Sequence, residues 1–289
     1  MKQKWEWLDR KEYPFAPKHF AVGQNQLHYI DEGEGEILLF VHGTPSWSFD
    51  FRYQIKALSQ HCRCIALDHI GFGLSDKPAE YDYRTQNHAL TLQKFIEHLN
   101  VKDITLIMHD FGGVIGFDYA LKNVTNIKRL VVLNSWLWDA SQEPEYQKLR
   151  KILRSPLLPF LYQWLNFSPR FILPQSFANP KKLTKRLHKH YTAPFANRKE
   201  RKGALAFAHS LLHDQAWFQS LGNQLFLLKD KPMLLIWGMK DPVVLPHHLA
   251  KFEQAFLYKK VVKVETAGHF PQEEEPEIVL AALSEFLRT

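Results

Sequence analysis

The fold of this chain is decided by the stretch Leu106-Ile107-Met108-His109-Asp110-Phe111-Gly112-Gly113-Val114-Ile115-Gly116. An apolar, β-like run from 104 to 108 stops at Asp110, glycine follows, and a helix-like segment continues to Leu121. A strand that turns sharply into a helix around one reactive residue is the nucleophile-elbow arrangement, which usually carries serine. Because the nucleophile position here holds Asp110, the sequence predicts an aspartate nucleophile.

Strands and helices alternate on both sides of this stretch. The expected strands are 20–22, 27–30, 37–41, 62–67, 104–108, 129–133, 233–237 and 261–265. The expected helices outside the middle of the chain are 49–58, 85–99, 247–256 and 277–287. Continuous apolar strands that alternate with helices are typical of an α/β fold with a mostly parallel, helix-covered sheet.

The alternation breaks in the middle of the chain. Residues 138–213 contain no convincing strand and offer helical stretches at 146–153, 157–165, 183–191 and 203–212, separated by prolines. We therefore predict a helical cap domain of residues 138–213, inserted after the sixth strand. The core domain would then consist of residues 1–137 and 214–289.

Reactive side chains follow four of the expected strands. They are His42-Gly43-Thr44-Pro45, Asp110, Asp241 and His269. Each has an ordinary structural explanation when taken alone: Asp110 could cap a helix, Asp241 could form a turn, and His269 could pack in one. Functional residues of parallel sheets lie at the carboxyl ends of strands, and nucleophile, acid, histidine is the order of the α/β-hydrolase triad. Together the residues predict a catalytic triad.

The chain resembles the α/β-hydrolase superfamily over essentially its full length and, within it, the haloalkane dehalogenases. The resemblance is carried by Trp7-Leu8-Asp9-Arg10, Tyr13-Pro14-Phe15, the loop from His42 to Phe49 with Arg52, the segment from Asp68 to Pro78, and His109-Asp110-Phe111-Gly112-Gly113. It implies the α/β-hydrolase fold and hydrolysis of carbon–halogen bonds in small apolar substrates.

An aspartate at the elbow predicts covalent catalysis through an ester. A carboxylate is already a nucleophile at neutral pH, so Asp110 can attack an sp³ carbon directly. His269, oriented by Asp241, would then activate the water that hydrolyses the ester. The backbone N–H groups of Thr44 and Phe111 are the expected oxyanion donors. We predict no metal and no organic cofactor, because no Cys/His cluster or phosphate loop is evident.

The leaving-group site departs from the dehalogenase pattern. That family holds the halide between an indole N–H directly after the nucleophile and a second N–H, from an Asn in His-Gly-x-Pro or a cap tryptophan. Here these positions hold Phe111 and Thr44. We predict Trp164 as a cap donor, with Trp136 and Trp138 as less favoured substitutes. Asn134 stands where one dehalogenase subgroup places its acid and cannot serve, so the acid falls to Asp241.

Three alternatives stay open at this point. An epoxide hydrolase would use cap tyrosines, and Tyr146, Tyr162 and Tyr191 are available, although Met108 and Thr44 fit the dehalogenase pattern better. Related aspartate-bearing hydrolases also open strained lactones. A non-catalytic protein that binds small molecules with the same fold is the third alternative.

Charge and cysteine content bear on partners and compartment. The chain carries a net charge of +7, and nine positive residues against Glu200 between Lys181 and Lys202 give that segment +8. We expect a solvated helix face there, with a membrane surface or an anionic partner as the alternative. We expect no nucleic-acid partner, no membrane association and a monomer. Cys62 and Cys64 cannot form a long-range disulfide, and residues 1–9 lack an apolar signal, so a cytoplasmic location is expected.

Overall fold

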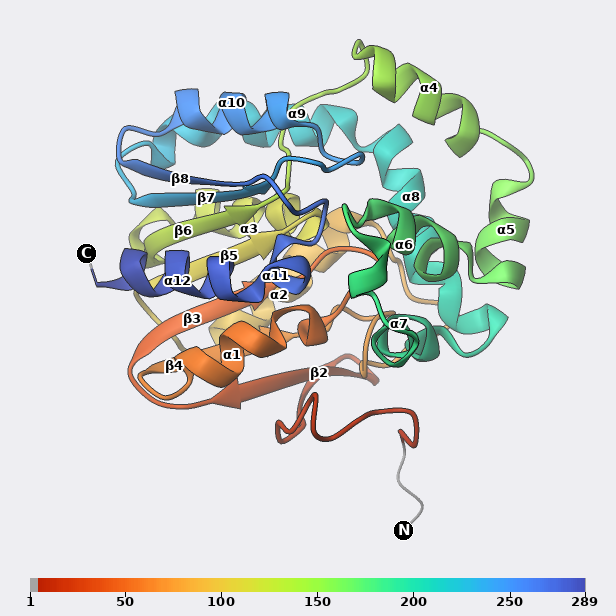
Figure 1. The fold of residues 1–289 in the computed structure, drawn as a ribbon, viewed down its shortest axis with the longest axis horizontal. Helices are drawn as coiled ribbons and strands as arrows, with labels where there is room; N and C mark the ends of the chain where they lie inside the picture. Colours follow the sequence, from red (N-terminus) through yellow and green to blue (C-terminus); the bar gives the residue numbers. More distant parts are fainter. Residues whose placement is uncertain (1–4, 289) are drawn as a thin grey trace.

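One eight-stranded sheet forms the centre of the protein (Figure 1). The computed structural model describes residues 5–288; residues 1–4, which belong to the segment judged above for a secretory signal, and residue 289 lie outside it. The strands lie in the order β1-β2-β4-β3-β5-β6-β7-β8. Their bounds are β1 Lys18–Val22, β2 Asn25–Glu32, β3 Glu36–Val41, β4 Cys62–Leu67, β5 Ile104–His109, β6 Ile127–Leu133, β7 Met233–Gly238 and β8 Lys259–Val264.

The sheet is mostly parallel, as predicted. Only the pairs β1–β2 and β2–β4 are antiparallel, and the five remaining pairs from β4 to β8 are parallel. Parallel strands run in one direction, so the carboxyl ends of β3, β5, β6, β7 and β8 meet at one edge of the sheet. All the reactive side chains predicted from the strand ends lie at this edge.

Helices cover both faces of the sheet. Successive residues of β3 point to opposite faces, so Leu38 and Phe40 belong to one buried cluster and Leu39 and Val41 to the other. The first cluster packs against α1 (Arg52–Leu58) and α12 (Pro276–Leu287). The second packs against α2 (Thr85–Leu99), α3 (Phe111–Lys122) and α10 (Pro246–Ala255). Two further helices, α9 (Gln215–Gln224) and the short α11 (Pro271–Glu274), were not predicted.

A helical insertion follows β6 and lies over the carboxyl ends of the strands (Figure 1). It contains α4 (Pro144–Leu153), α5 (Leu158–Leu165), a π-helical turn (Ser168–Ile172), α6 (Leu173–Ser176), α7 (Lys185–Thr192) and α8 (Lys202–His213). The predicted place of the insertion is therefore confirmed, while the boundary at 138–213 stays a prediction. In the described part of the chain, no helix combines the length and apolarity that crossing a membrane requires.

The loop after β4 is held by the buried carboxylate of Asp68. Asp68 accepts hydrogen bonds from the backbone N–H groups of Ser48 and Leu74, both at 2.8 Å, and lies 2.8 Å from Nδ1 of His28. Burial by itself would raise the pKa of Asp68, but the charge of His28 and these hydrogen bonds outweigh it and hold the pKa below its usual value. One side chain thus joins three segments of the chain.

Substitution Asp68→Ala is expected to destabilise the fold by about 3 kcal/mol, because it leaves three donors buried without an acceptor. Urea unfolding followed by circular dichroism would measure the loss. Glu80→Ala, which removes an exposed carboxylate, is the matched control and should change stability by less than about 0.5 kcal/mol. Equal midpoints for the two variants would contradict the role assigned to Asp68.

Candidate active site

Asp110 stands on a sharp turn between β5 and α3. Its φ of 53° and ψ of −128° are uncommon for a residue with a side chain, so the surrounding structure must hold this conformation in place. Glycines make the close approach possible: a Cβ at Gly112 would lie 2.0 Å from the carbonyl oxygen of Val41. A Cβ at Gly43 would lie 2.1 Å from Oδ1 of Asp110. The elbow predicted from sequence is present in the structure.

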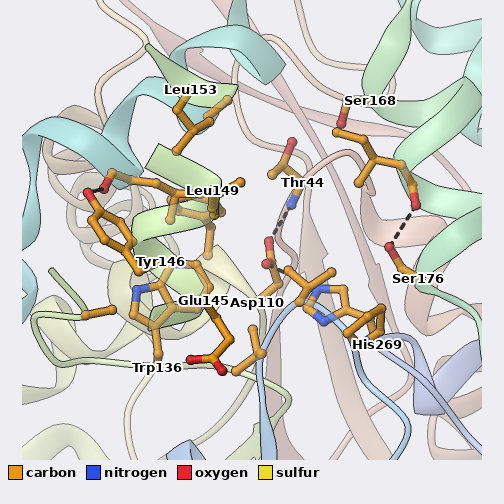
Figure 2. Close-up of a pocket in the computed structure, with 18 of the residues that line it drawn as sticks. Thr44, Asp110, Trp136, Glu145, Tyr146, Leu149, Leu153, Ser168, Ser176 and His269 are labelled. Carbon is orange, nitrogen blue, oxygen red and sulfur yellow. Dashed lines mark hydrogen bonds and ion pairs between the residues drawn. The ribbon is translucent and has the colours of Figure 1, made fainter. Parts of the chain in front are cut away.

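The structure brings Asp110, His269 and Asp241 together from the ends of three strands. Nε2 of His269 lies 3.2 Å from Oδ2 of Asp110, and Nδ1 of His269 lies 2.7 Å from Oδ2 of Asp241. All three side chains are buried. Figure 2 shows the Asp110 carboxylate between Thr44 and His269.

Two backbone N–H groups bind the Asp110 carboxylate. The N–H of Thr44 donates to Oδ1 at 2.8 Å, and the N–H of Phe111 also hydrogen-bonds to this carboxylate. These are the two donors that the sequence predicted for an oxyanion hole. Both donors are bound to the carboxylate before any reaction, with Thr44 on Oδ1, so no reorganisation is needed for them to stabilise negative charge there.

Asp241 is fixed by several donors. Its Oδ1 accepts the backbone N–H groups of Val243 at 2.6 Å and Val244 at 3.0 Å. Its Oδ2 accepts Nδ2 of Asn134 at 2.7 Å in addition to the His269 ring. Asn134 was excluded as the acid from sequence, and its role as a donor to the acid was missed. Its position at the end of the neighbouring parallel strand was the available signal.

The charges at the site hold a proton on the histidine. Burial by itself would lower the pKa of His269, but the charge of Asp241 and the hydrogen bonds that the ring donates to both carboxylates raise it to about 10. Burial would likewise raise the pKa of Asp110, but the hydrogen bond and charge of His269 hold it below its usual value. The surroundings of the free site therefore favour the protonated ring of His269 and the ionised form of Asp110.

Two further side chains position His269 and were not predicted. Nε2 of His109 lies 2.8 Å from the backbone carbonyl oxygen of His269, and Nδ1 of His109 lies 3.2 Å from the carboxylate of Asp50. Glu274 accepts the backbone N–H of Gly268 at 2.7 Å. The adjacency of His109 to Asp110 and the run of glutamates after His269 were the only sequence signals.

An apolar cavity of about 240 Å³ opens beside Asp110 (Figure 2). The core supplies its floor, and α4, α5 and α8 of the insertion supply its roof. The apolar side chains in its lining include Phe111, Trp136, Leu149, Leu153, Ile172 and Leu211. A buried nucleophile facing a small apolar cavity suits a small apolar substrate.

Comparison with known families agrees with the fold. A family described as the alpha/beta hydrolase fold matches residues 36–276. The chain belongs to the α/β-hydrolase family. It is 30% identical over 279 residues to "Haloalkane dehalogenase 2" of Mycobacterium tuberculosis, with 96% of each chain covered. It is 33% identical to "Cis-3-alkyl-4-alkyloxetan-2-one decarboxylase" of Shewanella oneidensis, with 95% of this chain and 89% of that protein covered.

Solved structures show the same fold. The haloalkane dehalogenase DatA from Agrobacterium tumefaciens C58 aligns with a TM-score of 0.85 at 24% identity, covering 94% of this chain and 96% of DatA. The dehalogenase DbeA from Bradyrhizobium elkani aligns with a TM-score of 0.85 at 24% identity, covering 95% and 98%. The resemblance stated from sequence is thereby confirmed for the fold and the family.

Two tryptophans nominated for the leaving group lie away from the cavity of this α/β hydrolase. Trp164 is 57% exposed, stacks on Phe160 and lies under the guanidinium of Arg198. The prediction of Trp164 as a halide donor is therefore corrected. Since Tyr162 faces the cavity, a residue two positions later on α5 points about 200° away.

Of the other two tryptophans, Trp138 lies away from the cavity and Trp136 lines it. Trp138 packs edge-on against Phe252 at 4.8 Å and does not line the cavity. Trp136 does line it and makes an edge-to-face contact with Phe111 at 4.9 Å. The less favoured substitute, Trp136, is thus the tryptophan that the structure places at the site, together with the predicted Phe111.

Several hydroxyl groups lie in the cavity wall, beside the charged and amide side chains Glu143, Glu145, Gln215 and His248. Tyr162 lines it, bonds to Ser168, and has its pKa raised to about 12 by burial. Tyr146 also lines it, but its hydroxyl donates to the backbone carbonyl of Leu211 at 2.6 Å. Tyr191 bonds to Glu273 and does not line the cavity.

Thr44 differs from the tyrosines because its hydroxyl is unused. Oγ1 of Thr44 is buried and has no hydrogen-bond partner within residues 5–288. The same residue lines the cavity, and its backbone N–H binds the Asp110 carboxylate. A buried hydroxyl without a hydrogen-bond partner costs free energy. The Thr44 hydroxyl can therefore donate a hydrogen bond to a leaving anion without breaking an existing one.

One cluster of potential metal ligands lies at the rim of the cavity. Among the described residues, Glu143, His247 and His248 place ligand atoms within 4.8 Å of one another. Nζ of Lys251 lies 3.0 Å from Oε1 of Glu143 and already supplies a positive charge there. The cluster joins the start of α4 to α10, and it lies apart from the Asp110–His269 pair.

Substitution Asp110→Asn is expected to lower the pKa of His269 well below about 10, because it removes one of the two carboxylates that raise this pKa. The Nδ1–H proton signal of His269, followed by NMR across a pH titration, would measure the change. Asp118→Asn, which alters a carboxylate paired with Lys122 on the far part of α3, is the control. An unchanged titration in Asp110→Asn would contradict the proposed charge arrangement.

Proposed function

We propose that this protein is a hydrolase that forms a covalent ester between Asp110 and a small apolar substrate, which a water activated by His269 then hydrolyses. One observation carries the proposal: Oδ2 of Asp110 lies 3.2 Å from Nε2 of His269, while Thr44 holds Oδ1. Asp110 is the proposed nucleophile, His269 the base and Asp241 the acid that orients it. The predicted oxyanion donors are Thr44 and Phe111.

The first step uses the oxygen that the backbone leaves free. Since Oδ1 of Asp110 is bound by the backbone N–H of Thr44, we take Oδ2 as the attacking atom. It forms a C–O bond to an sp³ carbon as the bond from that carbon to the leaving group breaks, and the electron pair departs with the leaving anion. No proton is needed at this stage, so the protonated His269 does not hinder attack.

The second step follows from the loss of charge on Asp110. Esterification neutralises one of the two carboxylates beside His269, so the pKa of the imidazole falls and its proton passes to solvent. Neutral His269 then accepts a proton from water, and the resulting hydroxide adds to Cγ of Asp110. Oδ1 carries the negative charge and remains bound to the N–H of Thr44, and the N–H of Phe111 binds the same carboxyl group. The bond from Cγ to the ester oxygen then breaks, His269 protonates the departing alkoxide, and the alcohol leaves. The carboxyl group of Asp110, which now contains the oxygen of the water, passes its remaining proton to His269, and the resting charges are restored.

Hydrolysis of carbon–halogen bonds is the reaction that we place first. The apolar cavity beside Asp110 and the near full-length similarity to "Haloalkane dehalogenase 2" support it. The leaving halide would meet the Thr44 hydroxyl in place of the indole and amide N–H groups of the dehalogenase pattern. Such a site would stabilise halide less strongly than two N–H donors.

Opening of a strained lactone is the second candidate. The same attack by Asp110 on the sp³ carbon of a lactone C–O bond would release a carboxylate, which can accept a hydrogen bond from Thr44. The 33% identity to the oxetanone decarboxylase of Shewanella oneidensis favours this class. Epoxide opening would follow the same route with Tyr162 at the leaving oxygen.

Substitution His269→Gln is expected to trap the ester on Asp110, because attack by Asp110 is retained and water activation is lost. The purified variant would be incubated separately with 1-bromohexane, a β-lactone and styrene oxide. Mass spectrometry of the intact protein and of the peptide containing Asp110 would identify the substrate class by the added mass. Asp110→Asn, treated identically, is the control and should gain no mass. An unmodified His269→Gln variant with all three substrates would refute the ester mechanism and favour a binding protein.

Substitution Thr44→Val is expected to slow ester formation about tenfold to a hundredfold, because one hydrogen bond to a developing anion is lost while the backbone N–H remains. Rapid-quench measurement of halide or carboxylate release in the first turnover would detect the change. Thr44→Ser keeps the hydroxyl and should retain most of the rate. Equal rates in Thr44→Val and the wild type would exclude Thr44 as the leaving-group donor.

A further inference from the structure

The outer face of the cap is unusually apolar. Leu157, Phe160 and Trp164 are 63%, 51% and 57% exposed, and Phe160 stacks on Trp164 on the outside of α5. The exposed large apolar side chains between α4 and the π-helical turn that do not line the cavity are Ile152, Leu157, Phe160, Trp164, Leu165 and Phe171. We call these six residues the cap patch. A run of exposed apolar residues on two successive helices marks an interaction surface.

The cap is also strongly basic. Twelve Lys and Arg residues and no Asp or Glu lie between Lys148 and Lys199. Since the whole chain carries +7 and this segment +12, the remainder carries −5, so the net excess of positive charge lies in the insertion.

Basic side chains stand beside the cap patch itself. Lys148, Lys151, Arg154, Arg170 and Arg198 are exposed, and none of them forms an ion pair with a carboxylate of residues 5–288. The guanidinium of Arg198 lies 4.7 Å above the ring of Trp164. Apolar and cationic groups therefore share one surface.

The helices that carry the cap patch also roof the cavity. Tyr146 and Leu153 on α4 and Tyr162 on α5 face inward and line the cavity, while Ile152 and Trp164 on the same helices face outward. Figure 1 shows α4 and α5 at the outer edge of the cap, on the side away from the sheet. The outer surface is thus about one helix diameter, roughly 10 Å, from the substrate cavity.

We propose that the cap patch docks on an anionic membrane surface, from which an apolar substrate passes into the cavity between the cap helices. Apolar side chains would enter the boundary between headgroups and acyl chains, and the surrounding Lys and Arg residues would meet anionic lipid headgroups. The route for substrate rests on the proposed function, whereas the docking itself does not. This replaces the expectation of a merely solvated basic face and of no membrane association.

Other partners fit these residues less well. A nucleic acid would be bound by the cations but would leave six large apolar side chains without a role. A symmetric dimer through the cap patch would bring two strongly positive surfaces together, because the same patch meets itself across the axis. A lipid surface satisfies the apolar and the cationic groups at once.

Vesicle flotation would test the proposal. The full-length wild type would be mixed with vesicles of phosphatidylcholine alone or with 30% phosphatidylglycerol, at low salt and at 0.5 M NaCl. Binding is expected to the anionic vesicles at low salt, with a large decrease in neutral vesicles and at high salt. Phe160→Ser combined with Trp164→Ser, or Lys148→Glu combined with Lys151→Glu, is expected to reduce the bound fraction about tenfold or more.

Matched variants outside the cap provide the controls. Phe226→Ser combined with Leu257→Ser removes two exposed apolar side chains of the core, and Lys94→Glu combined with Lys263→Glu reverses two exposed charges there. Both should bind vesicles like the wild type and should unfold at the same urea concentration as the cap variants.

Several outcomes would overturn the proposal. The wild type would fail to bind vesicles, or the core variants would lose as much vesicle binding as the cap variants. The protein would bind DNA but no vesicles, or light scattering would show a dimer that the Phe160→Ser and Trp164→Ser changes dissociate.

Flotation requires no turnover, and the His269→Gln trapping experiment uses soluble substrate without vesicles. Failure of the membrane proposal can therefore be distinguished from failure of the proposed hydrolase function.

Discussion

The rest of this site depends on one interaction: the buried carboxylates of Asp110 and Asp241 both contact the imidazole of His269. Unpaired charges in a protein interior are costly, and the ring of His269 lies 3.2 Å from Oδ2 of Asp110 and 2.7 Å from Oδ2 of Asp241, where a proton on the ring is favoured. The arrangement is stable at rest and is disturbed only when Asp110 loses its charge. A reaction that esterifies Asp110 would therefore lower the pKa of His269. The ring would lose its proton and could then act as a base, without any movement of the protein.

The surrounding fold supplies the donors that make this charge arrangement tolerable. Asp110 is bound by two backbone N–H groups on a strained turn, and Asp241 by two more and by Asn134. Most of these donors are backbone groups, whose positions depend on the sheet and the elbow and not on side-chain rotamers. Fixed dipoles of this kind stabilise charge without reorganisation. The geometry of the candidate site is thus a property of the strand ends of the sheet.

The parts of this structure that depend on local pattern could be predicted from the sequence. β4 and α2 occur at the predicted residues because each is an apolar run with clear end signals, and the positions of Asp110, Asp241 and His269 followed from strand ends. α9 was missed, since its sequence is rich in Gln and Asn and its burial depends on α3 and α8. Trp164 was assigned to the wrong side of α5, because nearly every residue of that helix is apolar and the pattern does not define an inner face. The unused hydroxyl of Thr44 depends on what surrounds it in three dimensions, which no sequence pattern reports.

The apolar residues on all sides of α5 also indicate what the helix contacts. A helix that is apolar on one side and polar on the other has one partner, whereas a helix that is apolar all round has partners on both sides. α5 has the cavity and α8 on its inner side, and Phe160 and Trp164 are exposed on its outer side. A surface of this kind is costly in water unless something covers it part of the time. The basic residues around it restrict what that cover can be, because only a partner with both apolar and anionic groups matches the whole face.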